Sequence, residues 1–480
     1  MSHPPVQIQC ANPDCLHADN PLGQAVCDRC QTPLLYRYLW ALDAAHIPVD
    51  TMVADRYWVV RPQVWLDTQP GQGADVPTLM PNSMLPYLQL YGQRLHTPGL
   101  YGFCAEAEDT AAIALLDNAP IDSTGQLLPN LATVWQSTAP ARQLYWLWQI
   151  LQLWQPLQGL EVARSLLIPE NLHVEGWRVR LRELTSDRPP SPGAEMETEA
   201  PADSDSSPDA EGSGLPLLKD LGNLWLAWVD TASAAIAAPL RHLCEQMQTV
   251  EETALEAIAA QLNALLLEQV AQLPLQVESV GATTTGPQRT HNEDACFPDE
   301  STQADPLIPY VGIICDGIGG HEGGEVASQL ALRSLKLQTR ALLAELLEQA
   351  EPLSPTVVAQ QLTGMVRVVN NLIAAQNDSQ GRALRQRMGT TLVMALQLPQ
   401  PLPNQGGNAH ELYLVHVGDS RAYWITPEYC HQLTVDDDVV TREVVMGRSP
   451  YQEAIRRPDG GALIQALGTR GSELLDINVQ

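Results

Sequence analysis

The hydrophobic pattern of the chain changes character several times along its length. Residues 215–272 repeat apolar positions at helical spacing and are rich in Leu, Ala and Glu. From Val277 onward, short alternating strands, glycine-rich turns and long helices follow one another. Residues 186–214, which precede the helical pattern, contain no residue more apolar than Met196 and the alanines. This pattern predicts a helical segment and an α+β domain, with a disordered segment before them.

The chain has 480 residues, which is too long for one ordinary core, since a domain commonly has about 150 residues. We therefore expect a multidomain protein with a small metal-binding ribbon, an α+β or mostly helical middle domain, and a C-terminal α+β domain. The expected regions are 1–40 (ribbon), 50–185 (middle domain), 186–214 (disordered acidic insert rich in Pro and Ser), 215–275 (helical remainder of the middle domain) and 277–480 (C-terminal domain).

The charge and the N-terminus restrict the partners and the compartment. The formal charge is -29, from 27 Lys plus Arg against 56 Asp plus Glu, and such a chain repels nucleic acid. The start of the sequence lacks the basic and apolar regions of a secretory signal. The longest apolar stretch, Leu224 to Leu240, contains Asp230 and is shorter than the ~20 residues that span a bilayer. We expect a cytoplasmic protein without a membrane partner.

Four cysteines near the N-terminus have the spacing of a zinc site. Cys10 and Cys15 form one close pair and Cys27 and Cys30 a second, separated by eleven residues. Four thiolates complete a tetrahedral shell, so the zinc would be structural and without an open position. Two disulfides or four unrelated thiols are the alternatives. The other cysteines lie in apolar surroundings typical of buried reduced thiols: Cys104, Cys244, Cys296, Cys315 and Cys430.

A guanidinium and two carboxylates lie close together at the start of the C-terminal domain. Arg289 precedes Glu293 and Asp294 on one short loop-to-strand segment. The planar fork of arginine can hold two phosphate oxygens, and its charge persists at physiological pH. Arg289 is therefore a candidate for binding phosphate.

A second candidate lies at the end of a predicted buried strand. The apolar run Tyr310–Cys315 is followed by Asp316 and by five glycines within the next eight residues. A buried carboxylate is costly unless it is paired or bound to a metal, and Mg²⁺ and Mn²⁺ prefer such hard oxygen ligands. The alternative is a plain strand, turn and helix in which the aspartate is a cap.

Two further segments carry little information singly. Residues 389–391, Gly-Thr-Thr, lead into an apolar strand, and Gly418-Asp419-Ser420 forms a tight turn between two alternating strands, 412–417 and 421–425. The second segment by itself predicts only a hairpin. Their order along the chain, after Arg289 and Asp316, is what gives them meaning.

In this order the motifs resemble those of the metal-dependent serine/threonine protein phosphatases of the PPM (type 2C) family. The resemblance covers residues 277–480 and implies a central β-sandwich flanked by pairs of helices. Its signatures are R-x-x-x-E-D (289–294), D-G-x-G-G-H (316–321), G-T-T (389–391) and V-G-D-S-R-A-Y (417–423), followed by Leu433-Thr434 and Ala466-Leu467-Gly468.

The resemblance also implies a site for two Mg²⁺ or Mn²⁺ ions and phosphoprotein substrates. The implied metal ligands are Asp316, the carbonyl of Gly317, Asp294, Glu293 and Asp419. Asp316 would bridge the two ions, Asp294 and Glu293 would reach them directly or through water, and Asp419 would belong to an additional metal position. Arg289 would bind the substrate phosphate. Arg289, Asp294 and Asp316 are thus the expected catalytic residues.

The sequence departs from the family in its last part. The family continues after Ala-Leu-Gly with an S-D-G strand and a later D-N pair, and neither occurs before Gln480. Asp476 and Asn478 lack the surroundings to replace them, and Asp436-Asp-Asp stands where an aspartate-histidine step is usual. We therefore expect a truncated phosphatase domain that is inactive in this form. The alternative is a non-enzymatic signalling scaffold.

The N-terminal half resembles parts of other signalling proteins. The cysteine segment is similar to the four-cysteine prefix of cyanobacterial serine/threonine kinases, and 55–60 resembles a first kinase strand. Residues 163–174 resemble a kinase catalytic loop with Asn171 at the metal-binding position, but Leu166 replaces the catalytic aspartate and Glu183 stands for the aspartate of D-F-G. The resemblance implies a pseudokinase, with kinase or signalling partners; an unrelated helical domain is the alternative.

Overall fold

The chain forms two compact units in a computed structural model. The structure describes residues 6–105, 112–188, 214–249, 255–287, 289–299, 305–318, 323–349, 351–402 and 409–480. The first unit comprises Met1–Leu255 and Gly447–Gln452, and the second comprises Glu256–Met446 and Glu453–Gln480. The predicted disordered insert, 186–214, lies almost entirely outside the described residues. The two units are described separately.

The first unit is built on a six-stranded antiparallel sheet. Alternating strand residues such as Leu39, Val59 and Trp65 are fully buried and form one core cluster. The strand at the fourth position, β3, comes earlier in the chain than the three strands that precede it in the sheet. The strands follow the order β4 (Met52–Val53), β5 (Tyr57–Arg61), β6 (Val64–Asp67), β3 (Arg37–Ala41), β8 (Ile113–Asp117) and β7 (Gly99–Cys104).

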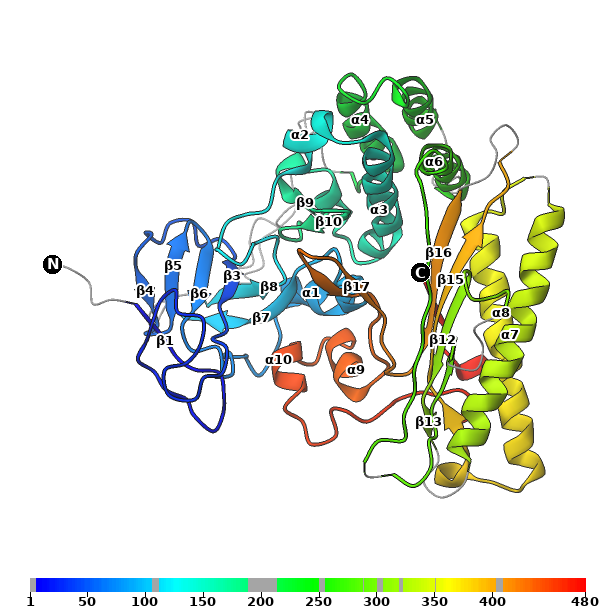
Figure 1. Cartoon of the computed structure of the whole chain (residues 1–480). Helices are drawn as coiled ribbons and strands as arrows, with labels where there is room; N and C mark the ends of the chain where they lie inside the picture. Colours follow the sequence, from blue (N-terminus) through cyan, green and yellow to red (C-terminus); the bar gives the residue numbers. More distant parts are fainter. Residues whose placement is uncertain are drawn as a thin grey trace, which may run out of the picture. The chain divides into compact units, whose positions relative to one another are not determined.

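Helices and a hairpin complete the first unit (Figure 1). The longest helix, α3 (Pro140–Gln158), begins with proline, whose missing N–H costs nothing at a first helical position. It buries Leu144, Leu147 and Trp154 among others. The remaining elements are α1 (Leu85–Gln89), α2 (Leu131–Val134), β9 (Leu172–Glu175), β10 (Arg178–Leu181), α4 (Leu218–Val229) and α5 (Ala237–Thr249).

The middle part of the chain is thus mixed in secondary structure, and its helices do not reach membrane length. The apolar stretch Leu224–Leu240 is divided between α4 and α5. In the described part of the chain, no helix combines the length and the apolar character needed to span a bilayer. The helical pattern predicted for 215–272 is confirmed by α4, α5 and α6 (Leu255–Val270), of which α6 falls in the second unit from Glu256 onward.

The second unit contains a five-stranded antiparallel sheet. The predicted strand over 310–315 is confirmed as β12 (Val311–Cys315). Of the expected sandwich, the described residues form this sheet and two short pairs, β13 (Gly317–Ile318) with β14 (Gly389–Thr390) and β17 (Tyr423–Ile425) with β18 (Cys430–Gln432). The large sheet has the order β11 (Ala295–Phe297), β12, β15 (Leu392–Pro399), β16 (His410–Val417) and β19 (Asn478–Val479).

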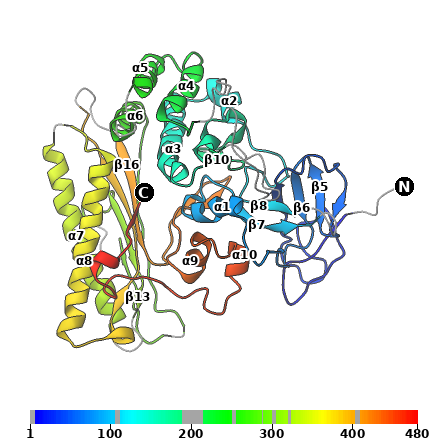
Figure 2. The ribbon, with the colours of Figure 1, turned by 180° about the vertical axis from the view of Figure 1, so that it is seen from behind.

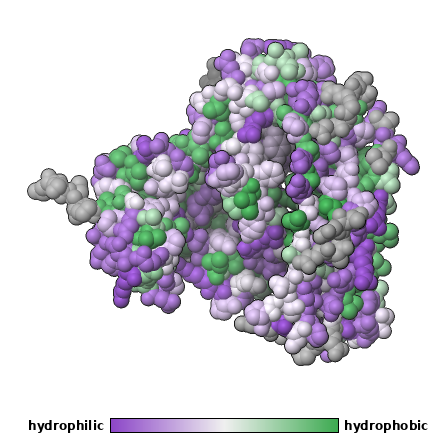
Figure 3. Space-filling view, viewed as in Figure 1, coloured by the Kyte–Doolittle hydropathy of each residue, from purple (hydrophilic) through white to green (hydrophobic). Residues whose placement is uncertain are grey.

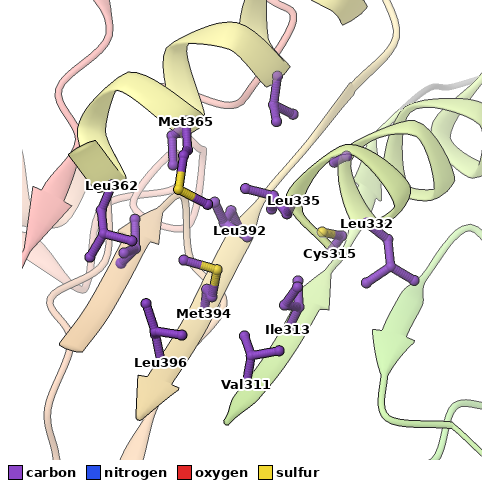
Figure 4. Packing of buried hydrophobic residues seen from close by; sticks show 14 of the residues in the cluster. Val311, Ile313, Cys315, Leu332, Leu335, Leu362, Met365, Leu392, Met394 and Leu396 are labelled. Atoms are coloured by element: carbon purple, nitrogen blue, oxygen red, sulfur yellow. The ribbon is translucent and has the colours of Figure 1, made fainter. Parts of the chain in front are cut away.

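Two long antiparallel helices, α7 (Gly324–Glu348) and α8 (Pro355–Ser379), cover one face of this sheet (Figures 1 and 2). Because side chains alternate between the faces of a strand, every second residue of β12 and β15 points at the helices. Figure 4 shows Ile313, Met394, Leu335 and Met365 turned toward one another in this core. The same core contains Val311, Cys315, Leu332, Leu362, Leu392 and Leu396.

The remaining elements of the second unit are short helices and the helix α6. Asn263 of α6 donates a hydrogen bond of 2.7 Å to Glu411 of β16. The short helices are α9 (Val439–Val445) and α10 (Tyr451–Ala454), of which α10 belongs to the second unit only from Glu453 onward. The surface view shows hydrophilic residues over much of the visible face, with hydrophobic residues in small separate groups (Figure 3). This distribution agrees with the large excess of acidic residues.

Candidate metal-binding site

Strand pairing brings Asp294 and Asp316 together. Asp294 lies immediately before β11 and Asp316 immediately after β12, and the two strands are antiparallel with Ala295 opposite Cys315. This register puts the two aspartates side by side at the same end of the sheet. The neighbouring Asp294 contributes to raising the pKa of Asp316. The two residues that the sequence singled out are therefore neighbours in space.

The charges around Asp316 disfavour its ionised form. Partial burial raises its pKa to about 6, and the negative charges of Asp294 and Asp419 add to the shift, while Arg289 opposes it. The expectation that the carboxylate of Asp316 is buried is wrong, because Asp316 is exposed. Asp294 and Asp419 are exposed as well. Cys315 takes the buried position instead, since alternate residues of β12 face the core. An exposed group that prefers to lose its charge is a place where a cation binds favourably.

The Gly-Thr-Thr segment holds the backbone of Asp316 on both sides. The backbone N–H of Thr391 donates to the Asp316 carbonyl at 2.9 Å, and the Thr390 hydroxyl donates to the same oxygen at 2.9 Å. The Asp316 N–H donates to the Thr391 Oγ1 at 3.1 Å. Sequence reasoning found this motif but assigned it no contact. The structure shows that its two hydroxyl groups fix the aspartate in place.

Gly317 lies where no side chain fits. An added Cβ would be 2.3 Å from the Glu293 carbonyl oxygen and 2.4 Å from that of Gly324. Ser328 of α7 donates a hydrogen bond of 2.6 Å to the same Glu293 carbonyl, which ties the loop before β11 to the helix. This close approach explains part of the glycine density after Asp316. Residues 319–321 of the D-G-x-G-G-H motif lie outside the described residues.

Arg289 is exposed and lies near the carboxylates. Its Nη1 donates to the Glu293 Oε2 at 3.0 Å, and the arginine side chain is 72% exposed. Its charge is close enough to lower the pKa of Asp316. The guanidinium therefore combines a fixed carboxylate partner with donors that face solvent.

Asp419 lies in a turn that links two sheets, which corrects the expected hairpin. β16 pairs with β15 and β19, whereas β17 pairs with β18 and with no other strand among the described residues, so the strands on either side of the turn are not partners. Gly418 has φ +104, and an added Cβ would lie 2.7 Å from Thr391 Cγ2. Partial burial and the charge of Asp436 raise the pKa of Asp419.

The carboxylates fit a divalent cation in chemistry and charge. Hard oxygen donors from Asp294 and Asp316 lie at the same end of the sheet, and the negative charge of Asp294 disfavours the ionised form of Asp316. Among the described residues, no third carboxylate or imidazole atom joins them within 4.8 Å, since only the four cysteines form such a group. The described residues therefore offer a cation two side-chain ligands. The carbonyl of Gly317, a further expected ligand, follows Asp316 in the chain.

The four cysteines Cys10, Cys15, Cys27 and Cys30 converge on one point. All four sulfur atoms lie within 4.8 Å of one another, with 3.6 Å between Cys10 and Cys30 and 3.9 Å between Cys15 and Cys27. A tetrahedral zinc site with Zn–S of ~2.3 Å places sulfurs about 3.8 Å apart. Burial raises the pKa of Cys10 to about 12, and hydrogen bonding with Thr32 lowers that of Cys30 to about 6.

The other cysteines are mostly buried, as expected. Cys104, Cys244, Cys296 and Cys315 are buried, and none of the nine cysteines, all of which are described residues, forms a disulfide. Cys430 is exposed, so the expectation fails for this residue. It lies on β18, which belongs to a two-stranded sheet.

The residues that suggested a kinase loop are bonded to one another. The Asn171 side chain donates to the carbonyls of Ser165 and Glu183, both at 2.9 Å, and accepts from the Glu183 N–H at 3.0 Å. The Glu183 carboxylate accepts a hydrogen bond of 2.9 Å from the Trp40 indole. These side chains therefore hold the loop and the sheet together.

Comparisons with known proteins identify relatives for part of the chain. No family model matches the sequence. The chain is 30% identical over 198 residues to the serine/threonine phosphatase stp of Listeria monocytogenes, covering 40% of this chain and 68% of that protein. It is 32% identical over 198 residues to the serine/threonine protein phosphatase PstP of Mycobacterium tuberculosis, covering 41% of this chain and 32% of that protein.

Part of the chain is also similar to solved structures. The crystal structure of the Mycobacterium tuberculosis serine/threonine phosphatase PstP/Ppp is 29% identical, with a TM-score of 0.30, and covers 41% of this chain and 69% of that one. The PPM Ser-Thr phosphatase MsPP from Mycobacterium smegmatis is 26% identical, with a TM-score of 0.30 and coverage of 41% and 69%. The identity to the Listeria protein over more than two thirds of its length means that this chain belongs to the PPM family of serine/threonine phosphatases.

Proposed function

We propose that this protein is a Mg²⁺- or Mn²⁺-dependent phosphatase that hydrolyses phosphoserine and phosphothreonine in proteins. The observation that carries the proposal is the position of Asp294 and Asp316 side by side at the ends of two paired strands, with Arg289 near them. A structure of the relative PstP is described as a complex with 2 manganese ions, which supports a metal-dependent reaction.

Each residue of the pair has a defined task in this proposal. Asp316 and Asp294 would hold the cations together with the carbonyl of Gly317, and Glu293 would reach them directly or through water. Asp419 would belong to an additional metal position, and no side chain would act as a nucleophile. When bound, the cations lower the pKa of a water to ~7 and neutralise charge on the phosphoryl group. The ligand shell is small in the described residues, so we expect weak metal binding and low activity.

Arg289 would bind and orient the substrate. Its guanidinium is exposed, and Glu293 holds one of its nitrogens at 3.0 Å, which leaves further N–H groups for phosphate oxygens. Because the arginine is always charged, this contact would persist across the working pH range. We expect Arg289→Ala to raise KM for a phosphopeptide more than it lowers kcat.

The test is hydrolysis of a phosphopeptide by the full chain with Mn²⁺. Asp316→Asn should lose turnover, because an amide is a poor ligand for a hard cation and carries no charge. Asp378→Asn is the matched control, since Asp378 is 67% exposed, pairs with Arg387 and is not one of the expected metal ligands. Equal turnover by wild type and Asp316→Asn contradicts the proposal.

A second candidate is a signalling scaffold that binds phosphoproteins or signalling partners without hydrolysing them. The observation that favours it is the two-carboxylate ligand set, because the described residues offer no third ligand within 4.8 Å. Calorimetry of Mn²⁺ binding to the full chain separates the candidates. Tight binding of two ions contradicts the scaffold, and absence of binding contradicts the phosphatase.

We also propose that the four N-terminal cysteines bind one structural zinc ion. The support is the sulfur separations of 3.6 and 3.9 Å, which suit a tetrahedral shell and not disulfides. Purified chain should contain one zinc per molecule by elemental analysis, and Cys27→Ser should lose it. Cys430→Ser is the control because Cys430 is exposed and distant in sequence. A zinc content that is unchanged in Cys27→Ser contradicts this proposal.

A further inference from the structure

The turn that carries Asp419 is held by Asp437, which belongs to the three consecutive aspartates at the place of the family's usual aspartate-histidine step. The Asp437 Oδ2 accepts a hydrogen bond from the Gly418 N–H at 2.7 Å. The Asp437 N–H in turn donates to the Gly418 carbonyl at 2.8 Å. Both polar groups of the Gly418 backbone are therefore bound by one residue, 19 positions further along the chain.

Asp437 is itself fixed from the other side. The Gln465 Nε2 donates to the same Oδ2 at 2.8 Å, and the Ile464 N–H donates to the Asp437 carbonyl at 2.9 Å. Gln465 is buried, and its amide also accepts from the Asp476 N–H at 3.0 Å and donates to the Asp476 carbonyl at 2.8 Å. A buried amide with all these bonds has little freedom to move, so it gives Asp437 a rigid support.

The turn is connected directly to Asp316. The Ser420 hydroxyl lies 2.6 Å from the Thr391 hydroxyl, whose oxygen accepts the Asp316 N–H. Gly418 has no room for a side chain against Thr391. A continuous set of hydrogen bonds therefore runs from Gln465 through Asp437 and the turn to Asp316.

The neighbouring aspartates have other partners. Asp436 accepts from the Arg421 Nε at 2.9 Å, and Asp438 caps α9 by accepting from the Thr441 N–H at 2.7 Å. Of these three consecutive aspartates, Asp437 is the one whose carboxylate is bonded to the turn. The hydrogen bond to the turn that carries Asp419 is therefore made by the Asp437 carboxylate and not by its two neighbours.

We propose that Asp437 is a positioning residue that sets the place of Asp419 relative to Asp316 and thereby the affinity of the site for divalent cations. This inference rests on the proposed function, because it concerns the same metal site. Residues that orient metal ligands from behind typically contribute ~10–100-fold to metal affinity. The Oδ2 atom alone makes both side-chain bonds, so an amide oxygen can replace it.

The experiment compares three variants of the full chain. Asp437→Ala removes the acceptor, Asp437→Asn keeps it, and Asp438→Ala removes only the neighbouring helix cap. Mn²⁺ affinity is measured by calorimetry, and hydrogen exchange of residues 416–420 reports on the turn without metal. We expect Asp437→Ala to bind Mn²⁺ ~10-fold more weakly and to exchange faster in this segment. Asp437→Asn should stay close to wild type in Mn²⁺ affinity and in the hydrogen exchange of this segment.

The outcomes separate this inference from the proposed function. Wild-type affinity in Asp437→Ala, or equal losses in Asp437→Ala and Asp438→Ala, overturns the positioning role while the metal site stands. Rescue by Asp437→Asn supports it, because a merely structural loss of packing would not depend on the acceptor oxygen. A wild-type chain that binds no Mn²⁺ overturns the metal site and this inference together.

Discussion

Asp67 in the first unit and Asp316 in the second unit are both aspartates at the end of a core strand, but their surroundings are opposite. Asp67 is fully buried, and Arg56 binds its carboxylate through two nitrogens, at 2.9 and 2.8 Å. Tyr101 donates a further hydrogen bond of 2.7 Å. Asp316 is exposed, and the nearest charges include the like-charged Asp294 and Asp419.

The difference separates a structural charge from a candidate functional one. A carboxylate with no exposure must bring its own counter-charge, because an unpaired buried charge is very costly. Like charges can face one another only where water screens them, and there they favour a proton or a cation. An aspartate beside other aspartates is therefore the more informative sign of a ligand site.

The largest expected effect comes from breaking the buried pair. Asp67→Ala leaves the Arg56 guanidinium, whose side chain is 11% exposed, without its partner. We expect the first unit to lose ~3–5 kcal/mol of stability in urea unfolding. Ten of the 11 tryptophans lie in the first unit, so tryptophan fluorescence reports its unfolding.

Replacing both partners, in Arg56→Met with Asp67→Leu, should cost less than Asp67→Ala alone, because no charge is left unpaired. A loss below ~1 kcal/mol in Asp67→Ala would fall in the range of a surface pair and would remove the contrast with Asp316.

A second, smaller effect concerns a histidine of the first unit. Burial, together with the charges of Arg178 and Arg180, lowers the pKa of His96 to about 4. As the pH falls, the unfolded chain therefore protonates this histidine before the folded chain does. The contribution of neutral His96 to the stability of the fold is fully present above pH ~6.5 and is lost as the pH falls toward 4. Because His96 is only half-buried, we expect this loss of stability to be ~1–3 kcal/mol.

The measurement is urea unfolding of wild type and His96→Gln at pH 7 and pH 4.5, followed by fluorescence. Wild type should lose more stability than the variant between the two pH values. Equal losses would show that the shift of the His96 pKa does not contribute.

The smallest effect is expected at Asp316, and it has the opposite sign. Because the folded chain raises the pKa of Asp316 to about 6, its ionisation destabilises the metal-free fold as the pH rises from ~4 to ~6. Asp316→Asn should therefore be more stable than wild type at pH 7.5 in metal-free buffer, by less than ~1 kcal/mol because the group is exposed.

This change is measured by thermal unfolding followed by circular dichroism, and the difference should vanish at pH 4. With Mn²⁺ present the order should reverse, because only wild type gains stability from binding. A variant that is less stable than wild type in metal-free buffer would indicate that Asp316 has a partner like that of Asp67.

The sequence by itself determined the main elements and the ends of strands at which chemistry is concentrated. The alternation in 310–315 gave the strand β12 and the side that faces the core, because strand side chains alternate between faces. The sequence also predicted that the four N-terminal cysteines meet at one site, since the spacing of short turns restricts where thiols can meet. The order of the motifs was enough for the family.

The tertiary structure decided which side chains meet. Three features depend on contacts between distant segments: the exposure of Asp316, the pairing of β17 with β18, and the bonds of Thr391 and Asp437 to the turn. Local pattern fixes the direction of a side chain relative to its own strand, but its partners depend on how strands pair and how loops cross. Asp437 could therefore be seen in the sequence as an unusual acid, while its role as a support for Gly418 required the fold.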